Sequence, residues 1–150
     1  MIVVSDTTPL SELAKVGKLD LLRDVFGEII IPQEVYNEVT RGEHPAVSAV
    51  QSITWKSVRT VSDPQKVFDL LAETNLYLGE TAAIVLAEEL GVNQLLLDDR
   101  KARLVAESRY LPVIGTIGTV LLAKDEGLIT SIKEIMDNLR SRSVAQPCQR

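Results

Sequence analysis

The stretch IVVSDTTPL, residues 2–10, decides the fold class. Its apolar run Ile2–Val4 is typical of a buried parallel strand, and Asp6 follows at the carboxyl end of that strand. A second stretch, LLLDDRKAR at 95–103, has the same order: an apolar run leads into Asp98 and Asp99. Because open α/β sheets bind ligands at the carboxyl ends of their strands, we expect these carboxylates to share one edge of a sheet.

The rest of the chain alternates between strand-like runs and segments of helical period. Runs at 2–5, 28–31, 94–97 and 112–114 are separated by helical segments, and a further edge strand is expected near Trp55. This alternation predicts an α/β fold with three layers, in which helices cover both faces of a central, mainly parallel sheet. Thr8 is expected to cap the first helix, with Pro9 at its first position.

Length and composition set further limits. The 150 residues fit a single domain, expected at 1–140 with a flexible tail at 141–150. The net charge of -5 argues against a protein that holds nucleic acid through a broad basic surface. The single cysteine, Cys148, suits a reducing cytoplasm, and no apolar stretch approaches the ~20 residues of a membrane span, so a soluble cytoplasmic protein is expected.

Two further acids fall on predicted helices. Glu38 lies on an amphipathic helix, where most glutamates are simply solvated, and Glu80 begins an almost entirely apolar helix, where a glutamate also favours the helix dipole. Together with the strand-end aspartates they supply the oxygen ligands that Mg²⁺ or Mn²⁺ prefers. Of Asp98 and Asp99, one is expected to bind the metal while the other caps the next helix; the sequence leaves open which.

Several motifs together resemble the PIN domain, and most closely a prokaryotic subgroup related to the toxins of VapBC-type toxin–antitoxin pairs. They are VSDTTPL at 4–10, the stretch 32–38, LGETAA at 78–83, LLDDRKAR at 96–103, LPVIGTIG at 111–118 and AKDEGLI at 123–129. The resemblance implies a metal-dependent endoribonuclease with an antitoxin partner and a homodimeric state. By position it makes Asp6, Glu38, Glu80 and one of Asp98 and Asp99 the catalytic acids. It also gives Thr8 a supporting role beside the first acid.

Basic residues close to these acids are candidates for RNA contact. They are Arg41, Arg100, Lys101 and Arg103. The last three share one helix and could form a basic rim, whereas for any single one of them a solvated helix face is the simpler interpretation. The only histidine, His44, is expected in a surface loop, and Arg140 and Arg142 are either tail charges or part of an antitoxin contact.

Other classes fit less well. A receiver-type domain needs a phosphorylatable aspartate after a third strand and a strand-end lysine, and this chain has neither in a matching position. A dehalogenase-type phosphatase needs Asp-x-Asp at the first strand, where this chain has Asp6 followed by two threonines. A PIN-like module that binds RNA or protein without cutting remains the alternative to an enzyme.

Overall fold

The structure, a computed structural model, describes residues 1–145, and the side chains of residues 1–140. Within these residues five strands form one sheet: β1 (Val3–Ser5), β2 (Ile29–Pro32), β3 (Lys56–Arg59), β4 (Gln94–Leu96) and β5 (Val113–Ile114). Their order is β3-β2-β1-β4-β5, and every neighbouring pair is parallel. The prediction of a mainly parallel α/β sheet is confirmed, and the edge strand expected near Trp55 is β3.

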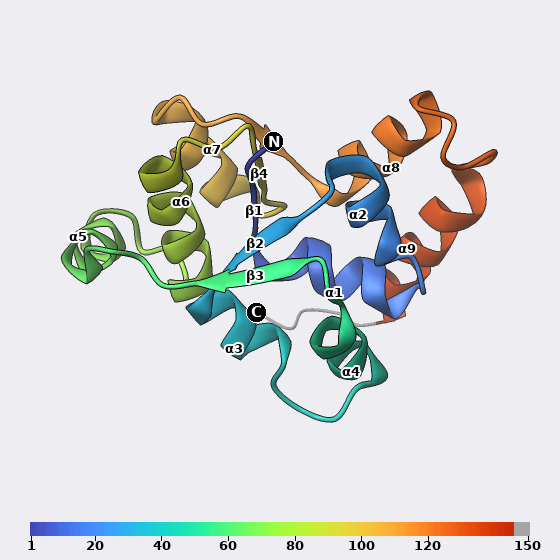
Figure 1. Cartoon of the computed structure of the whole chain (residues 1–150), viewed down its shortest axis with the longest axis horizontal. Helices are drawn as coiled ribbons and strands as arrows, with labels where there is room; N and C mark the ends of the chain where they lie inside the picture. The colour runs from blue at the N-terminus through green and yellow to red at the C-terminus, as the bar shows by residue number, and fades with distance from the viewer. Residues whose placement is uncertain (146–150) are drawn as a thin grey trace.

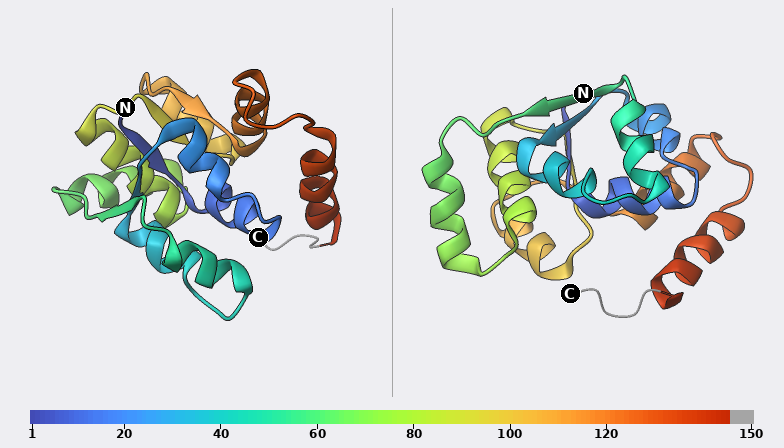
Figure 2. Two further views of the ribbon diagram at one scale, coloured as in Figure 1. Left: turned by 45° about the vertical axis from the view of Figure 1, so that its right-hand side comes forward. Right: turned by 90° about the horizontal axis from the view of Figure 1, so that it is seen from below.

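Helices cover both faces of this sheet (Figure 1). In chain order they are α1 (Thr7–Lys15), α2 (Asp20–Phe26), α3 (Gln33–Val39), α4 (Pro45–Ser52), α5 (Pro64–Thr74), α6 (Leu78–Leu90), α7 (Arg100–Ser108), α8 (Thr116–Asp125) and α9 (Lys133–Ala145). In Figure 1, α5, α6 and α7 lie to the left of the sheet, while α1, α2, α8 and α9 lie to its right. The two turned views of Figure 2 keep the same two groups of helices apart, which gives three layers.

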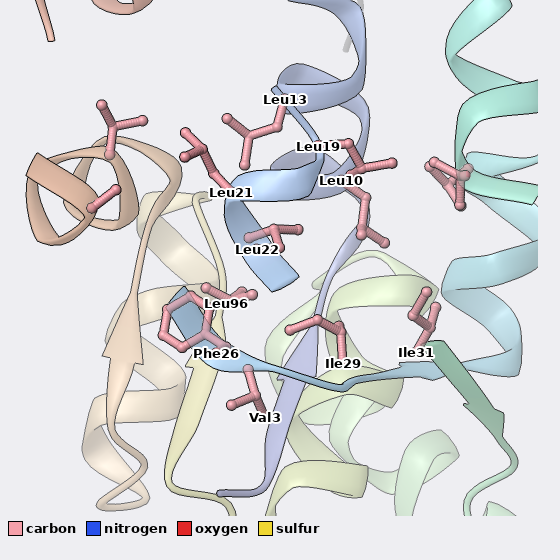
Figure 3. Packing of buried hydrophobic residues seen from close by; sticks show 14 of the residues in the cluster. Val3, Leu10, Leu13, Leu19, Leu21, Leu22, Phe26, Ile29, Ile31 and Leu96 are labelled. Atoms are coloured by element: carbon pink, nitrogen blue, oxygen red, sulfur yellow. The ribbon is translucent and has the colours of Figure 1, made fainter. Parts of the chain in front are cut away.

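The alternation of side chains along each strand builds a separate core on each face. Val3, Ile29 and Leu96 point toward α1 and α2, where they meet Leu10 and Leu22 (Figure 3). The intervening strand residues, among them Val4, Ile30 and Leu95, face the opposite core with the apolar helix α6. Burial on both faces explains why the central strands are continuous apolar runs.

Two boundaries differ from expectation. Helix α1 begins at Thr7, so Asp6 and not Thr8 occupies the N-cap position. Pro9 then lies third in the helix, where its missing N–H costs nothing because the first four N–H groups have no intrahelical acceptor. Helix α9 continues to Ala145, past the expected boundary at 140, and residues 146–150, including Cys148, lie outside the described part of the chain.

The strand order reverses direction at the centre of the sheet. From β1 the chain adds β2 and β3 on one side, and it later returns to add β4 and β5 on the other. The carboxyl ends of β1 and β4 therefore flank a topological switch point, the place where open parallel sheets bind ligands. Among residues 1–145, no helix has the length and apolar character needed to cross a membrane.

Candidate active site

Asp6 lies at the centre of the switch point. Its backbone N–H donates to the Leu96 carbonyl (2.9 Å), which extends the pairing of β1 with β4 by one residue and fixes the aspartate between the two strand ends. The residue is only 4% exposed. A carboxylate at this position is therefore held by the sheet itself and has almost no contact with water.

Glu38 reaches the same region from α3, which packs against both α1 and α6. Its Oε2 accepts a hydrogen bond from the Thr7 hydroxyl (3.0 Å). On its other side lies Gly79, in the first turn of α6: a Cβ added there would stand 2.5 Å from Glu38 Oε1. The glycine thus leaves the space that the glutamate carboxylate fills, next to the positive end of the α6 dipole.

Asp98 is held by the turn between β5 and α8. Its Oδ1 accepts the backbone N–H of Thr116 (2.7 Å), and its Oδ2 accepts the Thr116 hydroxyl (2.5 Å). The carboxylate therefore caps the N-terminus of α8, a helix whose own N-cap residue is Gly115. A Cβ on Gly115 would stand 2.6 Å from Asp98 Oδ1 and 2.9 Å from Arg103 Nη1, so that glycine lets a carboxylate and a guanidinium approach the same point.

Asp99 has a different position from its neighbour. Its Oδ2 accepts the backbone N–H of Ala102 (3.0 Å) and caps α7. Asp99 is therefore the member that caps the next helix, and Asp98 is the member whose charge acts on Asp6, which makes Asp98 the candidate metal ligand of the two.

Glu80 combines two roles. It is the third residue of α6, and its Oε1 accepts the backbone N–H of Tyr77 (3.2 Å), as a glutamate at a helix start commonly does. Its charge also acts on Asp6. The helix-start interpretation is therefore confirmed, while the role of the same side chain in a metal site stays a prediction.

The electrostatic environment of Asp6 links the four acids. The pKa of Asp6 is raised from 3.8 to about 7, mainly by burial and also by the charges of Glu80, Glu38 and Asp98, against the lowering effect of a hydrogen bond from the backbone of Thr7. Desolvation disfavours the charged carboxylate, and nearby like charges act in the same direction. An added cation would reverse both effects, because it offers the carboxylate an opposite charge at close range.

The four acids do not form a closed set of ligands. Within residues 1–145, no group of three or more His, Cys, Asp or Glu side chains stands ready to surround a metal ion. Three of them are instead held by polar partners of their own: Thr7, Thr116 and the backbone of Tyr77. This donor set still fits a hard cation, because Mg²⁺ usually takes one or two carboxylates and fills its remaining positions with water and substrate oxygens.

The basic residues surround this region unequally. Arg41 lines a cleft together with Thr7 and Glu38, and Arg103 is half-buried with its guanidinium against Gly115. Arg100 and Lys101 are exposed at the start of α7. Two of the four basic candidates, Arg41 and Arg103, therefore lie beside one of the acids.

The remaining candidate residues lie in a second cleft or away from the acids. Thr8 and Arg140 line a second cleft with Asp98 and Thr116, so Thr8 lies beside the acids although it does not cap α1. His44 caps α4, with Nδ1 accepting the N–H of Ala46 (3.0 Å), which matches the expected surface role. The side chain of Arg142 lies outside the described residues.

Four residues of the site were not recognised from the sequence: Thr7, Gly79, Gly115 and Thr116. Each acts on an acid that is distant in the chain, so its own neighbourhood carries little signal. One signal was present for the last two, because Gly115 and Thr116 follow β5, the neighbour of β4, and so lie at the same edge of the sheet.

Comparison with known proteins agrees with this architecture. Residues 2–145 match the family DUF3368, which is described as a PIN domain. The crystal structure of PAE2754 from Pyrobaculum aerophilum is similar to the chain with a TM-score of 0.61 and 18% identity over 82% of this chain and 96% of that one. At that identity the likeness concerns the fold alone. No curated protein matches the sequence.

Proposed function

Because the chain belongs to the PIN domain family, whose members are generally metal-dependent nucleases, we propose that it is an endoribonuclease that uses Mg²⁺ or Mn²⁺. The observation that carries the proposal is the position of Asp6. It is buried at the switch point of the sheet, where the charges of Glu38 on α3, Glu80 on α6 and Asp98 in the β4–α7 turn act on it. The hydrogen bonds of Glu38, Glu80 and Asp98 explain each acid singly but not their grouping around a buried aspartate, because the mutual repulsion of the carboxylates destabilises the fold.

Each acid has a defined part in this proposal. Asp6 and Asp98, at the two strand ends, and Glu38 and Glu80, on the helices, would hold the cation. A bound divalent cation would supply the lowered pKa of a water molecule and the positive charge that offsets charge on the phosphate. The protein's own contribution is to fix two of these carboxylates before substrate arrives, since Thr7 donates a hydrogen bond to Glu38 and Thr116 donates one to Asp98.

Two arginine side chains beside the acids are suited to bind RNA phosphates. Arg103 lies against Gly115 beside Asp98, and Arg41 lines the cleft that contains Glu38. A guanidinium pairs with phosphate oxygens through two parallel hydrogen bonds. Arg100 and Lys101, exposed on the first turn of α7, extend this contact along the backbone of the RNA.

The resemblance to VapBC-type toxins supports a narrower proposal. In it the protein is the toxin of a toxin–antitoxin pair, works in the cytoplasm as a homodimer and is held inactive by an antitoxin. A neighbouring gene for a small DNA-binding protein would support this role. Sedimentation that shows only monomers at micromolar concentrations would contradict the dimer.

The variant Glu80→Gln tests the nuclease with little disturbance of the fold. Glutamine keeps the acceptor for the Tyr77 N–H but removes the charge, so α6 stays capped while the acid site loses a carboxylate. We expect cleavage of a mixed RNA pool in Mg²⁺ or Mn²⁺ to fall by about 10- to 100-fold. Glu107→Gln, which alters an exposed glutamate on α7, is the matched control. Equal cutting by wild type and Glu80→Gln would assign the activity to another site or to a contaminant.

A non-catalytic RNA-binding module is the second candidate. It is favoured by the absence, within the described residues, of a closed ligand set around the acids. In that case RNA would bind without being cut, and Mg²⁺ or Mn²⁺ would leave the melting temperature unchanged, whereas a cation bound by the folded state raises it.

A further inference from the structure

We propose that the cleft between α3 and the start of α6 is a nucleobase subsite, which holds one base of the RNA next to the phosphate that is cut. It is called the Tyr77 cleft here and is lined by Thr7, Glu34, Glu38, Arg41, Tyr77 and Leu78, with Asn37 on its α3 side. The inference rests on the proposed function for its substrate class. It adds which part of the RNA binds here and which bases are preferred.

The cleft offers an exposed aromatic surface. Tyr77 is 64% exposed and Leu78 is 46% exposed, although both begin a helix whose following residues are buried. Base–aromatic stacking occurs with every base and needs an accessible ring of this kind. The volume of the cleft, about 600 Å³, lies within the range of sites for small organic ligands.

Glu34 contributes a carboxylate oxygen, Oε1, that has no hydrogen-bond partner among the described residues. This oxygen is buried. A buried acceptor without a donor destabilises the protein, and rotation of the Glu34 carboxylate into the cleft would let a ligand supply that donor and remove the penalty. The exocyclic amino groups of adenine and cytosine are such donors, and a carboxylate is a known acceptor for the cytosine amino group.

Asn37 supplies the complementary group. Its Oδ1 accepts from Gln33 Nε2 (2.9 Å), so its amide nitrogen remains the end that can donate. Adenine and cytosine each carry a ring-nitrogen acceptor beside the amino group. The wall of acceptor and donor therefore matches these two bases, whereas uracil has a carbonyl in place of the amino group and leaves Glu34 without that partner.

The cleft is continuous with the acid site. Glu38 belongs to both, and Thr7, which holds Glu38, lines the cleft as well. Arg41 stands in the same wall, where it can bind the phosphate that joins the held nucleotide to its neighbour. A base in the Tyr77 cleft therefore places its adjoining phosphate toward the acids.

Binding of labelled pentanucleotides in EDTA tests the subsite without any cleavage. We expect fluorescence anisotropy to show rA5 and rC5 binding more tightly than rU5 by about 5-fold, the size of one ordinary hydrogen bond. Tyr77→Ala should weaken all three by about 10-fold through lost stacking, and Tyr77→Phe should restore them. Phe68→Ala is the matched control, because Phe68 on α5 is 61% exposed and lies outside the cleft.

Glu34→Ala separates base selection from a structural role. It should make the three affinities equal while leaving the melting temperature unchanged or higher, since it removes an unpartnered buried oxygen. Two results would each overturn the subsite. One is the absence of binding to any pentanucleotide, which would favour a protein as the ligand of the cleft. The other is that wild type and Tyr77→Ala bind the pentanucleotides with equal affinity. Because EDTA removes the metal, this outcome is independent of the Glu80→Gln cleavage test, so the subsite and the nuclease can fail separately.

Discussion

Asp6→Asn is expected to abolish metal-dependent RNA cleavage and, in metal-free buffer, to stabilise the fold. The activity falls because the central carboxylate is lost. We expect a decrease beyond the ~100-fold that removal of a supporting partner typically causes. The stability rises because the variant no longer carries a buried carboxyl group whose charged form is desolvated and repelled.

The sign of the stability change depends on pH. Folded Asp6 keeps its proton up to about pH 7, whereas in the unfolded chain it loses the proton near its ordinary pKa of 3.8. The unfolded state therefore releases its proton first, and wild-type stability falls between about pH 4 and pH 7 and levels off above that. The free energy of unfolding that the wild type loses over this pH range is on the order of 4 kcal/mol, since each factor of ten in proton affinity corresponds to ~1.4 kcal/mol.

Urea unfolding of both proteins across this pH range measures the effect. The gap between Asp6→Asn and wild type should widen as the pH rises and should close when Mn²⁺ is added. Asp69→Asn, a change on the exposed face of α5, should follow the wild-type curve. Parallel curves for wild type and Asp6→Asn would show that Asp6 is not the buried, proton-binding member of the site.

Gly79→Ala is expected to lower cleavage while leaving stability intact. Alanine favours the α6 backbone by up to about 1 kcal/mol over glycine. Its Cβ, however, would stand 2.5 Å from Glu38 Oε1. The flexible glutamate side chain can move away at little cost, but it then leaves the Thr7 hydroxyl and its place among the acids. We expect a loss of about 10- to 100-fold in cleavage rate, as for other supporting residues.

A double variant shows whether Gly79 acts through Glu38. If it does, adding Gly79→Ala to Glu38→Gln should cause little further loss, because both changes remove the same carboxylate contact. Independent, additive losses would mean that the methyl group disturbs something else. A melting temperature that falls in step with activity would mean that the glycine is needed for folding.

The sequence revealed the strand-end acids because their signal is local. Asp6 and Asp98 each follow an apolar run of three residues, and the parallel sheet that such runs predict brings its strand ends to one edge. Strand β3 gave a weaker signal, since its residues are only partly buried at the edge of the sheet. The apolar pattern that identifies central strands is reduced there.

The supporting residues depend on contacts between distant parts of the chain. Gly79 matters because a carboxylate 41 positions earlier in the sequence fills the space beside it, and Thr116 matters because it binds an aspartate 18 positions earlier. No local pattern distinguishes such a glycine from an ordinary residue at a helix start. For the same reason the sequence could not distinguish the roles of Asp98 and Asp99, since the β5–α8 turn that holds Asp98 becomes its neighbour only after folding.

Calorimetric titration of the metal-free protein with Mn²⁺ tests the shared cation site most directly. Since Asp6 is largely protonated below pH 7 and a bound cation requires the carboxylate, binding should release close to one proton at about pH 6 and almost none at about pH 9. Buffers of different ionisation enthalpy measure that proton. Saturable binding with this pH-dependent release, lost in Asp6→Asn, is the expected result. The absence of binding, or binding with the same proton release in Asp6→Asn, would contradict a site built on these four acids.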